Sequence, residues 1–175
     1  MTVLCEIASI TKGQSPSKKA IKDNAALASI ITGEAITALG YLVLGNDEAG
    51  PVPKSYLKTY KVKKYDVLVS NNSQNVKVGV YNSSSQSVAM SSVYIIRPHK
   101  RLGLKAKKQW AALVCVSITR ASKLLKAATT RIGNSWYLHK HALEEITLVD
   151  ETKSFEIFKH EQLLYKKILL LRERL

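Results

Sequence analysis

The sequence predicts an α+β fold, with a curved antiparallel β-sheet, packed helices and a C-terminal helix of the coiled-coil type. Three features indicate this. Short apolar or alternating segments joined by polar loops fill residues 60–98, as in antiparallel sheets. Apolar residues at helical spacing occupy residues 105–125. Isoleucines and leucines at heptad spacing lie near the C-terminal end.

Four strands are predicted in the central region. Residues 60–63 and 76–81 alternate with period two, and residues 67–70 have the composition of a short buried strand. A further strand is expected over residues 88–96, before Pro98. Tyr65 and Asp66 are expected to form a turn, and polar loops join the other strands. Short connections of this kind favour a strongly curved sheet.

The N-terminal third is less regular. Residues 4–10 predict a short strand or a turn of helix. Residues 25–31 favour a helix, whereas residues 41–44 favour a buried strand. The Asn, Asp, Gly and Pro residues of segment 45–53 predict a loop.

A helix is predicted over residues 105–125, and a break follows at residues 133–135. Residues 146–149 are expected to form a last strand. The apolar face of the helix is expected to contain Trp110, Leu113, Val114 and Ile118.

The C-terminal segment has a heptad seam, which predicts a helix over residues 153–175 after a domain of residues 1–152. Two heptads are only marginally stable alone. The helix therefore either packs on its own domain or pairs with another chain. The seam residues, expected to mediate dimerisation, are Ile157, Leu164, Ile168, Leu171 and Leu175.

Positive charge is concentrated in the middle of the chain. Residues 51–143 hold 17 Lys or Arg and a single acidic residue, Asp66, whereas the flanking segments are nearly neutral and the whole chain carries +14. Such an excess repels itself unless a polyanion neutralises it, which predicts nucleic-acid binding. Charge alone is also compatible with a ribosomal or membrane-surface protein.

Cys5 and Cys115 stand among apolar residues, outside any metal-binding spacing, and both are expected to be buried thiols. The sequence has no basic-then-apolar leader and no apolar run of about 20 residues. We therefore expect a soluble, cytoplasmic protein.

The sequence shows no catalytic constellation, no Walker loop and no metal-ligand spacing, so we expect no cofactor or metal. Asp66 would need further acids, such as Glu6, Asp23 or Glu34, to form a metal-dependent nuclease. The sequence instead favours Asp66 as a residue that caps a turn or pairs with a nearby Lys.

Residues for DNA contact are well represented. Base edges require short polar side chains, which the loops 71–75 and 83–87 provide, although both are equally compatible with ordinary hairpin loops. The cluster at residues 100–108 is the favoured phosphate site. The candidate DNA-binding residues are Lys18, Lys19, Lys54, Lys58, Asn71, Asn72, Gln74, Asn75, Lys77, Lys100, Arg101, Lys105, Lys107, Lys108 and Arg131.

Three segments together resemble one protein family. They are residues 4–10 (LCEIASI) with Gly13 and Pro16, residues 60–70 (YKVKKYDVLVS) with the strands up to Pro98, and residues 143–148 with Gln162 and the leucine-rich helix. This pattern is similar to the target recognition domain of specificity (S) subunits of type I restriction–modification systems.

The chain departs from that family in three ways. The family's turn usually reads Gly-Asp, where this chain has Tyr65-Asp66. The proline-rich strand expected before Gln162 is replaced by residues 147–150. Family members usually carry two recognition domains separated by two long helices, whereas this chain has room for one domain and one short helix. It therefore resembles a half-subunit or a fragment, in which the seam would pair two copies.

The resemblance implies that residues 1–152 recognise a sequence in double-stranded DNA without catalysing a reaction. The partners would be a methyltransferase subunit, which would hold S-adenosylmethionine and flip the base, and possibly a restriction subunit. Two alternatives stay open. One is an RNA-binding or ribosome-associated protein, because Tyr56, Tyr60, Tyr65, Tyr81 and Tyr94 lie among the basic residues. The other is a metal-dependent nuclease.

Overall fold

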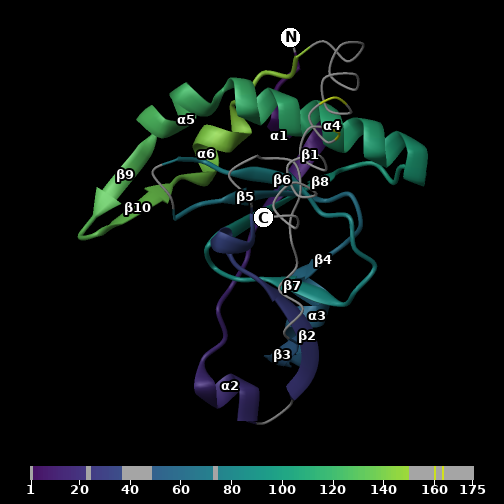
Figure 1. Cartoon of the computed structure of the whole chain (residues 1–175), viewed down its shortest axis with the longest axis vertical. Coiled ribbons are helices and arrows are strands. Elements are labelled where there is room, and N and C mark those ends of the chain that lie inside the picture. Colours follow the sequence, from purple (N-terminus) through teal and green to yellow (C-terminus); the bar gives the residue numbers. More distant parts are fainter. Residues whose placement is uncertain are drawn as a thin grey trace, which may run out of the picture.

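Two four-stranded sheets, a layer of helices and a small two-stranded sheet form the described part of the fold (Figure 1). The computed structural model describes residues 2–22, 25–36, 49–72 and 75–149, together with residues 160 and 163. In the view of Figure 1 the longest helix lies above the first sheet, and the second sheet lies below it. This mixed α+β architecture with antiparallel strands is the predicted fold class.

The first sheet is antiparallel throughout, with the order β1-β8-β5-β6. Helices cover one of its faces and the second sheet covers the other, so the side chains on both faces of its strands are buried. Val67 and Val69 pack toward the helices, and Leu68 packs toward the second sheet. The strands are β1 (Ala8–Lys12), β5 (Val67–Ser70), β6 (Val78–Val80) and β8 (Val93–Pro98).

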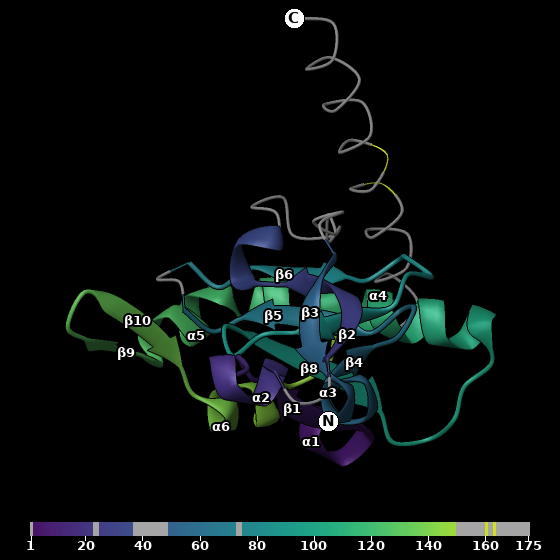
Figure 2. The same ribbon diagram turned by 90° about the horizontal axis from the view of Figure 1, so that it is seen from below.

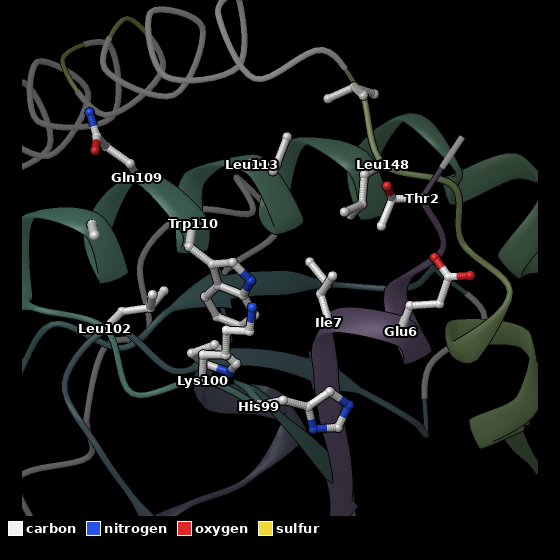
Figure 3. A pocket seen from close by; sticks show the side chains of 13 residues that line it. Thr2, Glu6, Ile7, His99, Lys100, Leu102, Gln109, Trp110, Leu113 and Leu148 are labelled. Atoms are coloured by element: carbon white, nitrogen blue, oxygen red, sulfur yellow. The ribbon is translucent and has the colours of Figure 1, made fainter.

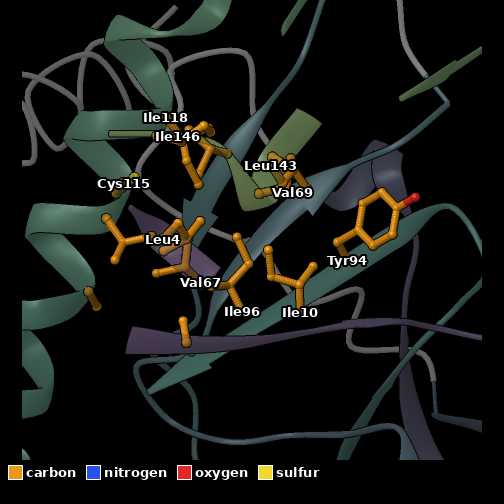
Figure 4. Close-up of a cluster of buried hydrophobic side chains, with 14 of the residues drawn as sticks. Leu4, Ile10, Val67, Val69, Tyr94, Ile96, Cys115, Ile118, Leu143 and Ile146 are labelled. Atoms are coloured by element: carbon orange, nitrogen blue, oxygen red, sulfur yellow. The ribbon is translucent and has the colours of Figure 1, made fainter. Parts of the chain in front are cut away.

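The helices bury a large apolar cluster against this sheet (Figure 4). The predicted helix is confirmed as α4 (Leu104–Arg120), which Ala121 separates from α5 (Ser122–Ala127). Every side chain from Trp110 to Ile118 is buried, so α4 is enclosed on all sides at its centre. The short helices α1 (Leu4–Ile7) and α6 (Lys140–Glu144) contribute Leu4 and Leu143 to the same cluster.

The second sheet has the order β3-β2-β7-β4 and includes one parallel pair, β2 with β7. The sequence predicts antiparallel pairing only, because short polar loops join each predicted strand to the next. The strands are β2 (Ala25–Ile31), β3 (Ala49–Pro53), β4 (Lys61–Val62) and β7 (Ser87–Ala89). The helices α2 (Lys18–Lys22) and α3 (Lys54–Thr59) contact β3.

Two predictions in this sheet were wrong. Residues 25–31 form β2 and not a helix, because pairing with both β3 and β7 overrides the helical preference of alanine. Residues 49–53 form β3 and not a loop. Pro51 and Pro53 are tolerated there because β3 is an edge strand, in which the N–H groups on the outer side have no neighbouring strand to bond.

The predicted strand over residues 88–96 is two strands in different sheets, β7 and β8. The chain turns between them, where Val93 N donates to Met90 O at 3.0 Å. Gly13 lies against this turn. A Cβ at that position would come within 2.3 Å of Met90 O and 2.4 Å of Ala89 O, so the close approach of the two backbones requires glycine.

Smaller differences concern the ends of the chain. Residues 4–10 contain both a helical turn, α1, and the start of β1. Cys5 is exposed, because it lies on the outer side of α1, whereas Cys115 is buried as predicted. Residues 146–149 form no strand, and the segment holds only an isolated bridge between Val3 and Thr147.

A third, two-stranded sheet projects from the helical layer (Figures 1 and 2). It consists of β9 (Thr129–Ile132) and β10 (Ser135–Leu138). The predicted break lies at its turn, where Gly133 adopts a φ of 60°. The predicted strand at residues 41–44, the seam residues and the domain boundary at residues 152–153 lie outside the described residues. Among the helices that are described, none combines the length and apolar character needed to cross a membrane.

Candidate nucleic-acid interface

Asp66 closes the predicted turn between β4 and β5 and is completely buried. The Lys63 amide donates to Asp66 Oδ2 at 2.7 Å, and the Asp66 amide donates to Lys63 O at 2.9 Å. Tyr65 has a φ of 64°, a left-handed conformation that favours glycine. This chain departs from the Gly-Asp pattern at Tyr65. Because the backbone at this position has a positive φ, the preference of the pattern for glycine has a physical reason.

Two cations from distant parts of the sequence reach this carboxylate. Arg97, at the end of β8, donates from Nη2 to Oδ2 at 2.5 Å and from Nε to Oδ1 at 3.2 Å. Lys107, in the first turn of α4, donates from Nζ to Oδ1 at 2.9 Å. The same two side chains also bond Lys61 O and Lys64 O, at 2.9 and 2.8 Å. We call this arrangement of Asp66, Arg97 and Lys107 the Asp66 node.

The Asp66 node explains why one acid stands in the basic stretch. Each carboxylate oxygen accepts two hydrogen bonds, which uses the acceptor capacity of the group. This is the turn-capping and Lys-pairing role predicted from the sequence, and it leaves no oxygen of Asp66 open toward a metal ion. Within the described ranges, no three His, Cys, Asp or Glu side chains are placed to hold a metal.

Exposed cations surround the Asp66 node. Lys61, Lys63 and Lys64 lie on the turn that Arg97 and Lys107 bind, and Lys105 and Lys108 flank Lys107 on α4. The structure therefore joins part of the predicted cluster 100–108 to the 61–64 segment, in which no contact residue is predicted from the sequence. Lys107 itself is mostly covered, with 14% of its side chain exposed, because it pairs with Asp66.

A second group of cations, Lys18 and Lys19, is exposed on α2, at the lower end of the molecule in Figure 1. Lys54 and Lys58 are exposed on α3, which contacts β3 and also β4, the strand that carries Lys61. A third group follows α4 and includes Arg131 on the β9–β10 ribbon. The structure thus distributes the predicted phosphate contacts over three regions.

The polar loop after β5 is only partly a surface loop. Asn71 is 2% exposed, its Nδ2 donates to Ser91 O at 2.8 Å, and its carbonyl accepts from the Leu138 amide at 2.8 Å. Its amide is therefore occupied inside the protein, which argues against the prediction that Asn71 reads a base edge. Asn72 and Asn75 are exposed, and Gln74 lies outside the described residues.

The remaining predicted contacts are at the surface. Lys100 and Arg101 are exposed in the segment between β8 and α4, and Lys77 is half-buried just before β6. Lys100 borders a hollow of about 640 Å³ between α1 and α4 (Figure 3). Trp110 lines the same hollow, and its buried Nε1 has no hydrogen-bond partner among the described residues.

The interleaved tyrosines are mostly structural. Tyr81 and Tyr94 are buried, with Tyr81 bonding Ser87 Oγ at 2.6 Å and Tyr94 donating to Leu138 O at 3.0 Å. Burial raises the pKa of Tyr94, which keeps its hydroxyl protonated and able to donate. Tyr56 and Tyr60 pack edge to face with centroids 5.0 Å apart. Two of the five rings are therefore inaccessible to a stacked base.

Comparisons with known proteins identify the architecture. No protein-family model and no curated protein matches the chain. The structure is similar to a chain from a type I R-M system described for its complex assembly and conformational transition (15% identity, TM-score 0.59), and to a type I restriction-modification S subunit from M. genitalium (9%, 0.57). It is also similar to the HsdS subunit from Thermoanaerobacter tengcongensis (15%, 0.55).

Each likeness covers 98% of this chain but only 38–40% of the other protein. The chain thus spans about two fifths of the length of the structures it resembles. The resemblance detected in the sequence is confirmed at the level of the fold: this chain folds like type I restriction–modification S subunits.

Proposed function

We propose that this chain recognises a specific sequence in double-stranded DNA as a specificity half-subunit of a type I restriction–modification enzyme. The observation that carries the proposal is the structural likeness to S subunits along 98% of the chain. The charge distribution supports it independently. Of the 17 cations between residues 51 and 143, only Arg97, Lys107 and Lys140 pair with a carboxylate in the part of the chain that the structure describes.

The proposed role is non-catalytic. Asp66, the one acid of the basic stretch, is occupied by Arg97, Lys107 and the Lys63 amide. The chain would bring a methyltransferase subunit, and possibly a restriction subunit, to a target. Methyl transfer and the base flipping it needs would belong to the methyltransferase subunit.

We further propose that two copies pair through residues 157–175 and so supply two recognition domains. The heptad pattern supports this. A two-fold pair would recognise two identical, inverted half-sites. Replacing Leu164, Ile168 and Leu171 with Asp should then give monomers, and an unchanged sedimentation coefficient would contradict the pairing.

The first test is copurification of the tagged full chain from its native cell. We expect a methyltransferase subunit in the eluate. The second test is selection from a pool of DNA duplexes with randomised centres, at several salt concentrations. We expect affinity to fall steeply with salt while one sequence remains preferred.

Two outcomes would replace the proposal. Preference for single-stranded RNA in the same buffer would favour the RNA-binding alternative, for which the half-buried Tyr65 with Lys64 Nζ 5.5 Å from its ring offers a stacking surface. Cleavage of DNA by the chain alone in the presence of magnesium or manganese would favour the metal-dependent nuclease alternative, if the Asp66→Ala variant no longer cleaves.

A further inference from the structure

The β9–β10 ribbon has one face turned toward the protein and one face exposed to solvent. Register pairs Arg131 with Trp136 and Thr129 with Leu138, which places these four on one face. Leu138 is 2% exposed and Trp136 is half-buried, so this face points toward the body near its base. The opposite face carries Thr130, Ile132, Ser135 and Tyr137, all of them exposed.

The ribbon is held firmly at its base. The Leu138 amide donates to Asn71 O at 2.8 Å, and Leu138 O accepts from the Tyr94 hydroxyl at 3.0 Å. Thr130 Oγ1 lies 2.9 Å from His139 Nε2, which closes the ribbon against the start of α6. A two-stranded ribbon anchored in this way presents its outer face in one orientation, as recognition requires.

The side chains of the outer face suit base edges in DNA. Ser135 has a hydroxyl that donates and accepts, Tyr137 has a phenol, and Ile132, with 62% of its surface exposed, has an apolar group of the kind that contacts a thymine methyl. The major groove of B-DNA admits a two-stranded ribbon. An isoleucine at this level of exposure also has no role in the core.

The surroundings of the ribbon favour a polyanion over a protein partner. No acidic residue occurs between Asp66 and Glu144, and Arg120, Lys123, Lys126 and Arg131 are all exposed on α4, α5 and the ribbon. Arg131 is oriented by two contacts: its Nε donates to Gly133 O at 3.1 Å, and its guanidinium lies 5.9 Å from the Trp136 ring centroid. It is thereby held beside the tip, where it would meet a phosphate flanking the groove.

We propose that the β9–β10 ribbon enters the major groove and reads base pairs with Ile132, Ser135 and Tyr137, while Arg131 binds the DNA backbone. The inference rests on the proposed function and names the element that supplies its specificity. None of these three outer-face residues was a site candidate from the sequence. The signal that could have found them is the Gly133-Asn134 turn between two short segments with polar or exposed side chains.

The test uses the full chain, with its copurified methyltransferase where one is obtained, and duplexes with randomised centres as the probe. Ile132→Ser and Tyr137→Phe should relax the selected sequence at one or two adjacent base pairs and leave binding to unselected DNA within about twofold. Arg131→Met should weaken binding to every duplex about tenfold at about 0.1 M salt, because one phosphate contact is lost. Leu124→Ser changes an even more exposed apolar residue on α5, 76% exposed, and should change neither property.

The outcomes separate the proposed function from the role of the ribbon. If the unmodified chain selects no sequence, the proposed function fails. If the unmodified chain selects a sequence, and the Ile132 and Tyr137 variants select that same sequence at every base pair, only the ribbon inference is overturned. Loss of the methyltransferase on Ile132→Ser, with the DNA preference intact, would also overturn it, because the ribbon would then bind protein. Melting curves of each variant confirm that the fold is retained.

Discussion

At the Asp66 node two cations reach a buried carboxylate, whereas on the β9–β10 ribbon Arg131 lies against an indole ring and a backbone carbonyl. Both regions belong to the same basic stretch of sequence. In the node, the charges of Arg97 and Lys107 join β8, α4 and the β4–β5 turn. On the ribbon, no carboxylate neutralises Arg131 among the described residues. A Lys or Arg in this chain is therefore informative about ligand binding only when its local partner is known.

The largest expected effect comes from breaking the node. Asp66→Asn removes the charge that Arg97 and Lys107 share and should lower the free energy of unfolding by about 3 kcal/mol, since their side chains are only 30% and 14% exposed. Urea denaturation measures this. The matched control is Glu144→Gln, which breaks the more exposed Lys140–Glu144 pair and should have a much smaller effect on stability. Equal losses would mean that the node does not join these elements.

A second comparison uses two neighbouring asparagines. Asn71→Ala removes the buried donor to Ser91 O and leaves that carbonyl unpaired, which should cost about 2 kcal/mol of stability. Asn72→Ala, at an exposed position, should cost about 0.5 kcal/mol or less. Urea titrations of both variants test this. A DNA preference altered by Asn71→Ala at unchanged stability would restore Asn71 as a base-reading residue.

A third comparison concerns lysines one residue apart. Lys108→Ala should reduce DNA affinity about tenfold at about 0.1 M salt and lower the slope of log affinity against log salt by about one, because Lys108 is exposed. Lys107→Met should instead act mainly on stability, because its ammonium is bound to Asp66. Binding isotherms at several salt concentrations separate the two. Equal changes in slope would show that Lys107 also contacts DNA.

The smallest expected effect concerns the base of the ribbon. Tyr94→Phe removes the donor to Leu138 O and should cost about 1 kcal/mol near neutral pH, whereas Tyr137→Phe at an exposed position should cost less.

Burial raises the pKa of Tyr94 above its ordinary value of 10.0. As the pH rises above the ordinary value, the tyrosine ionises in the unfolded state before it does in the folded state. The free energy of unfolding therefore falls as the pH rises through this alkaline range. The Tyr94→Phe variant should lose part of this alkaline dependence, which thermal melting between neutral and alkaline pH measures. An unchanged dependence would mean that Tyr94 does not contribute to it.

Local patterns in the sequence determined several elements correctly. The run Val67–Ser70 is a strand because its consecutive apolar side chains are buried on both faces. The spacing of Trp110, Leu113, Val114 and Ile118 produced α4, and the turn at Asp66 followed from its residues. These features depend on contacts between residues close in sequence, or on a periodic apolar face that can pack against any apolar surface.

Only the tertiary structure decided which residues would become partners across long separations. Ala25–Ile31 is a strand because β7 lies beside it, and Asn71 is buried because Ser91 and Leu138 reach it. Likewise, Arg97 and Lys107 are neutralised by a carboxylate 31 and 41 residues away, while the ribbon keeps one face exposed. Composition could establish that the chain carries an excess of positive charge. Three-dimensional packing decides which of these cations lack a carboxylate partner and which face of the ribbon is exposed. A local sequence pattern does not specify such distant neighbours.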